Sequence, residues 1–206
     1  MDCILKYFPS ITAAQQHQFE MIASLYEEWN AKINVISRKD IGNLYTHHVL
    51  HSLAIAREFN FQPETQILDF GTGGGFPGIP LAIMFPEVHF KLIDRTAKKI
   101  RVAQEVSKAL GLSNVTAKQL SGEEEKGKYD FVVSRAVMPL PDLVRIVRKN
   151  INHVQHNAHL NGLIVLKGGN LETELHPFRG KVECEPLSQW FEEEWFKEKD
   201  LIYLPL

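Results

Sequence analysis

The pattern of apolar positions changes in character near residue 66. Before it, apolar residues across 19–29 recur every three or four positions, which is the spacing of one face of a helix. The tetrapeptide Thr12–Gln15 has the form of a capping box and would start such a helix. We therefore expect one helix from this box to about Ala31, and a second helix over residues 40–58.

After residue 66, short runs rich in β-branched and aromatic residues alternate with segments of helical composition. The runs are QILDF, HFKLID, VTAKQL, YDFVVS and GLIVLK, and the helical segments cover residues 79–84, 96–110 and 139 to about 154. This alternation is typical of βαβ units, whose strands form a parallel sheet. We predict an α/β fold of the Rossmann-like, doubly wound, mostly parallel type over residues 63–206, with an N-terminal helical extension over residues 1–62.

The last residues break this alternation. QWFEEEWF and KDLIYLPL have the composition of two strands joined by a short charged turn. Strands joined by a short turn pair antiparallel. We therefore expect an antiparallel C-terminal hairpin at the edge of the sheet.

Length and composition narrow the class of protein. A chain of 206 residues, 44% of them hydrophobic, can bury one sizeable core. Its start, MDCILKYFPS, lacks the features of a secretion signal, and no apolar stretch is long enough to span a membrane, so we expect a cytoplasmic protein. The net charge of −2 does not attract polyanions to the whole surface, so a nucleic-acid partner would need a local basic patch.

The loop after the first strand, DFGTGGGFPG, carries the most specific motif. In open α/β sheets ligands bind beyond the carboxyl ends of the strands, and glycines let the backbone approach them. The dinucleotide pattern G-x-G-x-x-G fails here, because Phe76 stands in place of its third glycine. The loop instead resembles the D-x-G-x-G-x-G motif I of class I methyltransferases, with Asp69, Gly71, Gly73 and Gly75 in its fixed positions. A tight strand-to-helix turn without a ligand is the alternative.

Two further strand ends carry candidate cofactor contacts. Asp94 ends the second strand, where a carboxylate accepts hydrogen bonds from ribose hydroxyls of either NAD or S-adenosylmethionine. Gly122 and Glu123 follow the third strand, where class I methyltransferases contact adenine. A polar loop that starts a helix explains the latter pair equally well.

Basic and histidine residues near the strand ends are candidates for substrate contact. Arg95, Lys98, Lys99 and Arg101 follow Asp94 closely and suit RNA phosphates, although a solvated helix face is the alternative. Lys167 ends the fifth strand and either reaches substrate or belongs to a solvated turn. The histidines 47, 48 and 51 include an i, i+4 pair, but no third ligand is near, so we expect no metal and favour helix packing or RNA contact.

The residues at the end of the fourth strand bear on the reaction. Ser134–Val137 replaces the [ND]-P-P-[YF] motif that enzymes of this fold use on exocyclic amines. Neither Cys3 nor Cys184 lies at a strand end, which argues against a covalent cysteine adduct. A ring nitrogen such as purine N7 or a hydroxyl oxygen then remains as the methyl acceptor. Purine N7 carries no proton and needs no general base, so Arg135 would serve catalysis by positioning.

Together these residues resemble the RsmG (GidB) family of 16S ribosomal RNA guanine-N7 methyltransferases over nearly the whole chain. The resemblance rests on Trp29-Asn30, Asn34, His48, Ser52, the loop FGTGGGFPGIPL, residues 94–101, Ser134-Arg135-Ala136 and Lys167-Gly168. It implies S-adenosylmethionine as cofactor and 16S ribosomal RNA, or the small ribosomal subunit, as partner. The implied and motif-based cofactor contacts together are Asp69, Gly71, Thr72, Gly73, Gly75, Phe76, Asp94, Gly122, Glu123 and Arg135. One position departs from the family, because His51 stands where many members have an aspartate.

Three other functions remain open from the sequence. A methyltransferase for a small molecule or a protein would lack a basic surface around the mouth of its pocket. An NAD-dependent oxidoreductase is disfavoured by Phe76 in the glycine loop. A noncatalytic nucleotide-binding module would bind the cofactor without turnover.

Overall fold

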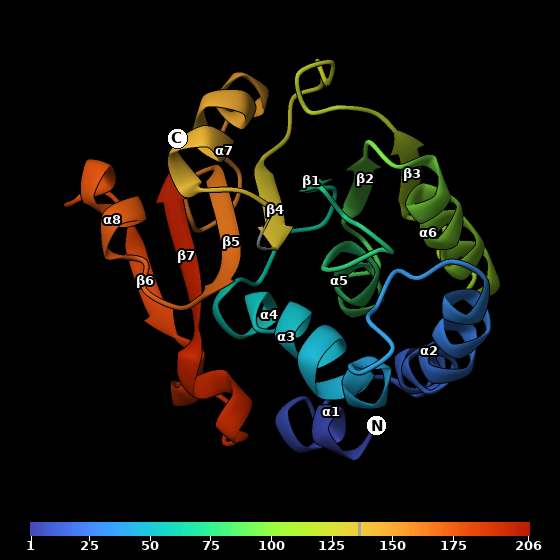
Figure 1. Cartoon of the computed structure of the whole chain (residues 1–206). Helices are drawn as coiled ribbons and strands as arrows, with labels where there is room; N and C mark the ends of the chain where they lie inside the picture. Colours follow the sequence, from blue (N-terminus) through green and yellow to red (C-terminus); the bar gives the residue numbers. More distant parts are fainter. Residues whose placement is uncertain (136) are drawn as a thin grey trace.

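A computed structural model describes residues 1–135 and 137–206. In the described chain, a seven-stranded sheet has the order β3-β2-β1-β4-β5-β7-β6 (Figure 1). Strands β1 to β5 pair in parallel, whereas β7 is antiparallel to both β5 and β6. The strands are β1 Gln66–Phe70, β2 His89–Asp94, β3 Val115–Gln119, β4 Phe131–Arg135, β5 Gly162–Gly168, β6 Glu183–Pro186 and β7 Lys199–Pro205. The predicted doubly wound α/β fold is confirmed.

The α-helices are α1 Asp2–Tyr7, α2 Ala13–Lys32, α3 His51–Leu53, α4 Ile55–Glu58, α5 Gly78–Met84, α6 Ala97–Ala109, α7 Leu140–Val147 and α8 Glu172–Leu175. Helix α2 begins as predicted, since Thr12 and Gln15 form both bonds of a capping box. The second predicted helix follows one helical path but is not uniform. It begins as a 3-10 turn at Ile41–Asn43 and continues as a π-helix over Leu44–Leu50 before α3 and α4.

The predicted hairpin was placed on the wrong segment. Strand β7 pairs with β6, not with QWFEEEWF, and β6 rather than β7 lies at the edge of the sheet. The run folds into 3-10 turns because its aromatics come in adjacent pairs, which do not alternate between two faces as strand residues do. Phe191 and Phe196 are both buried and pack at 4.6 Å between ring centroids, while Glu192 and Glu194 are exposed.

Two other element boundaries differ from the expectations. Helix α7 ends at Val147, followed by a 3-10 turn at Arg148–Asn150, so the predicted helix to about Val154 was too long. Helix α1 was not predicted, because six residues are too few to show helical periodicity.

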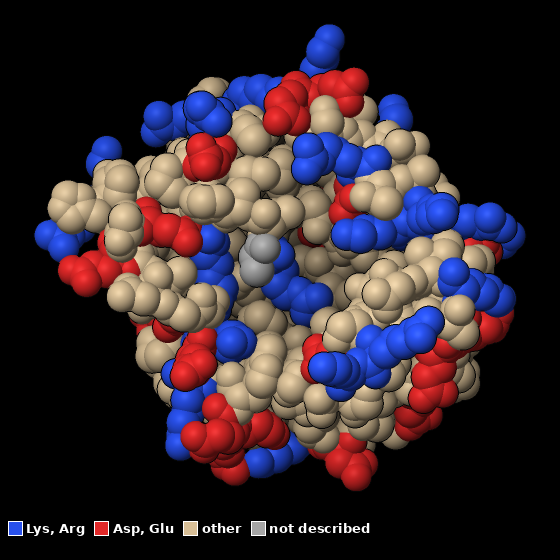
Figure 2. Space-filling view, in the orientation of Figure 1, with Lys and Arg blue, Asp and Glu red and all other residues tan. Residues whose placement is uncertain are grey.

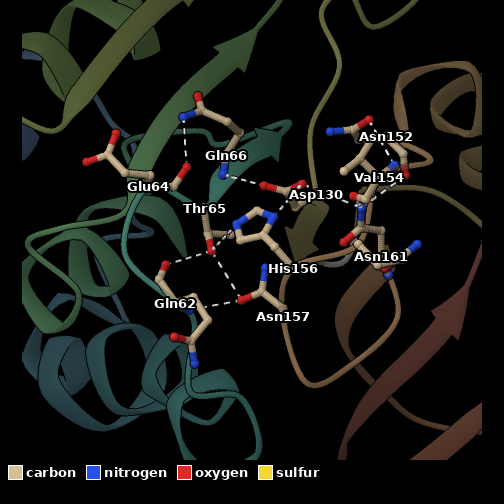
Figure 3. Close-up of polar contacts among 11 residues, drawn as sticks. Gln62, Glu64, Thr65, Gln66, Asp130, Asn152, Val154, His156, Asn157 and Asn161 are labelled. Carbon is tan, nitrogen blue, oxygen red and sulfur yellow. Dashed lines mark hydrogen bonds and ion pairs between the residues drawn. The ribbon is translucent and has the colours of Figure 1, made fainter.

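A cluster of polar side chains lies at the amino ends of the central strands β1 and β4, opposite the ends that carry the glycine loop (Figure 3). Asp130 is buried and accepts a hydrogen bond from the backbone of Gln66 at 2.8 Å. The amide of Asn161 donates to the carbonyls of Asn152 and Val154 at 3.0 and 2.7 Å. These bonds provide partners for two backbone carbonyls of the loop over residues 152–161.

The helical extension does not have a core of its own. Phe19, Ile22 and Tyr26 of α2 belong to the same cluster of buried side chains as Ile79 of α5 and Phe131 of β4. A division into segments 1–62 and 63–206 therefore remains a prediction. Within the described residues, no helix is both long and apolar enough to cross a membrane.

Candidate active site

The glycine loop follows β1, and the winding of the sheet reverses between β1 and its neighbour β4. Gly71 has a φ of +70°, and its N–H donates to the carbonyl of Ile93 at 2.9 Å. Gly73 has a φ of +58°, and a Cβ built there meets nothing within 4 Å. The first part of the loop therefore turns in the left-handed region and leaves open space at Gly73.

Asp69 braces this loop from beneath. The side chain is fully buried, and its Oδ2 accepts hydrogen bonds from Thr72 Oγ1 at 2.6 Å and from the Gly78 N–H at 2.7 Å. Burial raises the pKa of Asp69 to about 7, even though both hydrogen bonds act to lower it. Asp69 and Thr72, predicted as cofactor contacts, hold the shape of the loop and are not among the residues that line the two cavities described below.

The second half of the loop packs against the helical extension. Tyr26 donates a hydrogen bond from its hydroxyl to the carbonyl of Gly74 at 2.8 Å. A Cβ on Gly74 would lie 2.8 Å from Val35, and a Cβ on Gly75 would lie 2.3 Å from Ile79. These two glycines are required for close packing, and Gly75 does not line the cavity described next.

One cavity of about 200 Å³ lies over the carboxyl ends of β1, β2 and β3. This glycine-loop cavity is lined by Phe70, Gly71, Ile93, Asp94, Arg95, Thr96, Lys99, Leu120, Gly122, Glu123, Val137 and Met138. Four predicted cofactor contacts thus meet in one place: Gly71, Asp94, Gly122 and Glu123. Asp94 accepts hydrogen bonds from the backbone of Gly73 at 3.1 Å and of Thr96 at 2.8 Å, one on each carboxylate oxygen. Each oxygen keeps a lone pair for a ligand hydroxyl.

A second cavity, of about 300 Å³, lies beside the carboxyl ends of β4 and β5. This histidine pocket is lined by Asp40, His47, His48, His51, Arg135, Leu166, Lys167, Gly168, Trp195 and Lys199. Most of its walls come from the helical stretch before α4 and from the segment around the start of β7. The three histidines were predicted to serve helix packing or RNA contact, whereas Asp40, Trp195 and Lys199 were not predicted as site residues.

A chain of hydrogen bonds crosses the histidine pocket. Arg135 donates from one guanidinium nitrogen to the carbonyl of His47 at 3.2 Å and from another to Nδ1 of His48 at 2.9 Å. A guanidinium can only donate, so Nδ1 of His48 accepts and its Nε2–H donates to Asp40 at 2.7 Å. Burial and the charge of Arg135 lower the pKa of His48 to about 4, which agrees with this neutral form.

Arg135 and Phe76, both predicted as cofactor contacts, are placed together away from the glycine-loop cavity. The guanidinium lies over the Phe76 ring at 5.2 Å, and burial lowers the pKa of Arg135 to about 10, so it stays charged at neutral pH. Phe76 is buried against Tyr26 with ring centroids 4.8 Å apart. Arg135 thus lines the histidine pocket, and Phe76 supports it.

The predicted RNA contacts lie in three places: Arg95 lines the glycine-loop cavity, three others line a groove beside it, and Lys167 lines the histidine pocket. A groove of about 430 Å³ is lined by Lys32, Ile33, Asn34, Thr96, Lys98, Lys99 and Arg101. It shares Thr96 and Lys99 with the glycine-loop cavity, and Figure 2 shows basic side chains around a hollow in this face. Lys167 is different, because it is buried and bound by Glu174 and the Met138 carbonyl. The solvated turn considered for Lys167 is therefore wrong.

Asp40, Trp195 and Lys199 belong to the histidine pocket, although their sequence context gave little indication of it. Asp40 lies before a helical stretch, and Trp195 lies in the run assigned to a strand. The one available signal was the density of histidines after Asp40. Across residues 1–135 and 137–206, no three or more His, Cys, Asp or Glu side chains are grouped to hold a metal ion.

Comparison with known proteins adds a family. Residues 15–196 match the model of the family GidB, described as rRNA small subunit methyltransferase G. Two curated relatives are named "Ribosomal RNA small subunit methyltransferase G". The protein of Phocaeicola vulgatus is 59% identical over 100% of this chain and 99% of its own length, and that of Bacteroides thetaiotaomicron is 60% identical over 98% of each. A solved S-adenosylmethionine-dependent methyltransferase from Aquifex aeolicus has a similar fold, with a TM-score of 0.57 at 16% identity over 82% of this chain and 98% of that one.

Proposed function

The chain belongs to the rRNA small subunit methyltransferase G family, and we propose that it transfers a methyl group from S-adenosylmethionine to N7 of a guanine in 16S ribosomal RNA. The acceptor is the RNA itself or the small ribosomal subunit. The observation that carries this proposal is a cavity suited to an adenosine cofactor that opens beside a basic groove.

The residues of the glycine-loop cavity fit S-adenosylmethionine. Asp94 keeps one acceptor lone pair on each oxygen, as two ribose hydroxyls require. Gly122 is needed for the shape of the wall, because a Cβ there would lie 1.9 Å from the Phe70 ring. Gly73 leaves open space beside the loop, where the amino-acid part of the cofactor would pass. When bound there, S-adenosylmethionine supplies an electrophilic methyl group.

Methyl transfer requires this chain mainly to position the acceptor and the methyl donor. Methyl transfer needs the acceptor lone pair, the methyl carbon and the sulfur in line, and guanine N7 has its lone pair free at neutral pH. The titratable groups near the strand ends fit a reaction without a general base. Both ring nitrogens of His48 are hydrogen-bonded, one to Arg135 and the other to Asp40, and Asp69 is buried beneath the loop. The residues around both cavities therefore hold the two substrates and orient them for methyl transfer.

The basic groove favours RNA over a small molecule or protein. Lys98, Lys99 and Arg101 gather beside the cavity, although the whole chain carries a net charge of −2. Phosphates of a polynucleotide bind such a local cluster. A nicotinamide enzyme is disfavoured by the loop sequence, in which Phe76 replaces the third dinucleotide glycine.

Methyl transfer can be tested directly with S-adenosylmethionine carrying a tritiated methyl group. We expect label to enter the 16S RNA of small subunits that lack the modification, and to be recovered as 7-methylguanosine after digestion. Subunits that already carry the modification are the control and should take up little label. Label recovered on an exocyclic amine, or no label in RNA, would contradict the proposal.

A further inference from the structure

The histidine pocket lies where an acceptor base would have to enter. The segment around the end of β4 contributes to both cavities, since Arg135 lines the histidine pocket while Val137 and Met138 line the glycine-loop cavity. The carboxyl end of β5 forms another wall. The pocket volume of about 300 Å³ is at the lower end of small-molecule sites, which suits a single base.

The polar groups of this pocket include acceptors with spare capacity. Asp40 Oδ1 accepts from His47 Nδ1 at 2.6 Å and from Asn43 Nδ2 at 3.2 Å. Among the described residues, Oδ2 accepts only from His48 Nε2, at 2.7 Å. A carboxylate oxygen has two lone pairs, so Oδ2 can accept one more N–H. The Asp40 side chain keeps 31% of its surface exposed, so a ligand in the pocket can reach it.

Asp40 also remains charged and fixed. Partial burial acts to raise its pKa, but the hydrogen bonds from His47, His48 and Asn43 hold the pKa of Asp40 below its usual value. The ring of His47 is in turn stacked on Trp195, with centroids 4.3 Å apart and planes 13° apart. The carboxylate is therefore held in one orientation before any ligand arrives.

A second acceptor in the same pocket is unsatisfied. His51 is 95% buried (5% exposed), lines the pocket, and its Nε2 has no hydrogen-bond partner among the described residues. Buried polar atoms without partners are rare in proteins and point to a ligand or water. Burial and the charges of Arg135 and Lys199 hold the pKa of His51 well below its usual value, so its ring is neutral and one nitrogen accepts.

Resting on the function proposed above, we infer that the histidine pocket receives the acceptor guanine and that Asp40 accepts a hydrogen bond from its Watson–Crick edge. Guanine presents two donors there, N1–H and the N2 amine, whereas adenine presents an acceptor at N1. Enzymes that act on an extruded base commonly read this edge with hydrogen bonds. Since N7 lies on the opposite side of guanine from N1 and N2, binding this edge leaves N7 facing away from Asp40.

A cycle of protein and base substitutions tests the inference. Asp40→Ala removes the acceptor, and reconstituted small subunits carry inosine, which lacks the N2 amine, or 2-aminopurine, which lacks the N1 proton, at the methylated guanosine. The wild type should prefer guanosine over at least one analogue by about 10- to 100-fold in kcat/KM. In Asp40→Ala that preference should fall to within about threefold, because the contact it reports is gone.

Controls separate this contact from folding and from the reaction. Asp142→Ala removes an exposed carboxylate of α7, outside both pockets, and should keep the wild-type preference. Affinity for S-adenosylmethionine, measured by calorimetry, should be unchanged in Asp40→Ala and shows that the variant is folded. If it is not folded, Asp40→Asn replaces it, and the loss of charge should weaken the same preference. Equal preferences in wild type and variant overturn the inference alone, whereas a wild type that methylates no guanosine overturns the proposed function with it.

Discussion

The two cavities on either side of the end of β4 are built in different ways. The glycine-loop cavity is lined by residues at the ends of β1, β2 and β3 and in the loops that follow them, together with Val137 and Met138. The histidine pocket is lined by residues from four separate parts of the chain, at positions 40–51, 135, 166–168 and 195–199. A site at the ends of adjacent strands depends on topology, whereas one that joins distant segments depends on how the helical extension and the C-terminal segment pack.

The largest expected effect is a loss of cofactor affinity in the glycine loop. It tests whether the loop contacts the ligand or is only a strained turn. Gly73→Val places a β-branched residue at a φ of +58°, beside the space where the cofactor would pass. We expect affinity for S-adenosylmethionine to fall by more than about 100-fold, as measured by calorimetry. Circular dichroism should show that the fold is retained.

Gly180→Val is the matched control for this change. Gly180 has a φ of +78°, and a Cβ there also meets nothing within 4 Å, but the residue lies outside both cavities. It should cost similar stability and leave cofactor affinity unchanged. If both variants bind the cofactor equally well, the loop is only a structural turn.

The next effect concerns the histidine pocket. Arg135→Ala removes the donor to His48 and to the His47 carbonyl, so the pocket loses its order. We expect kcat at saturating RNA to fall by about 100-fold, because misplacement of the acceptor costs rate even when both substrates are bound. Cofactor affinity should stay within about threefold of wild type, since Arg135 does not line the glycine-loop cavity.

Arg135→Lys sharpens this result. A lysine keeps the charge but cannot serve two acceptors with a rigid fork, so it should recover little of the lost turnover. Arg145→Ala, on the exposed face of α7, is the control and should have wild-type kcat. A parallel loss of cofactor affinity in Arg135→Ala would move this residue to the cofactor site, as the family resemblance implied.

The difference between the cavities explains what the sequence could predict. The strands QILDF and HFKLID have the predicted bounds. Once the strands are placed, parallel topology brings Gly71, Asp94 and Gly122 to one edge of the sheet. These contacts therefore follow from local pattern and from the fold.

The histidine pocket could not be predicted in the same way. The stacking of His47 on Trp195 joins residues 148 positions apart, and no local pattern encodes that contact. The aromatic pairs of QWFEEEWF suggested a strand, yet they fill the core beside the helical extension. Lys167 shows the same limit, because its partner Glu174 lies beyond the strand that carries it.

A smaller effect, on the salt dependence of RNA binding, is expected from substitutions in the groove beside the glycine-loop cavity. Lys98→Ala combined with Arg101→Ala removes two cations that line the groove and not the cavity. The slope of log K for RNA against log salt should become less steep by about 1.4 to 1.8. With two fewer phosphate contacts, RNA binding releases fewer counterions. The double variant Lys126→Ala, Lys181→Ala, at exposed lysines outside the groove, should keep the wild-type slope. An unaltered slope in the first variant would remove this groove from the RNA-binding surface.

The smallest functional effect should come from Asp69→Asn, which tests whether the brace beneath the glycine loop acts by shape or by charge. An asparagine oxygen can accept the same bonds from Thr72 and Gly78, and the carboxylate oxygen that the amide nitrogen replaces has no partner among the described residues. Cofactor affinity should therefore stay within about threefold of wild type, given that a net hydrogen bond is worth only about 1 kcal/mol.

Stability gives this last prediction a pH signature. The pKa of Asp69 is about 7 in the folded chain and near 3.8 when unfolded, so between these values the folded state holds a proton that the unfolded state has released. The free energy of unfolding of the wild type should therefore fall relative to that of Asp69→Asn as pH rises from about 4 to about 7, and the difference should level off above pH 7. Urea unfolding at pH 4.5, 6 and 8 measures it. A constant difference in the free energy of unfolding between the two proteins would mean that Asp69 is ionised throughout. A large loss of cofactor affinity in Asp69→Asn would mean that the charge of Asp69, and not only its shape, serves the glycine-loop cavity.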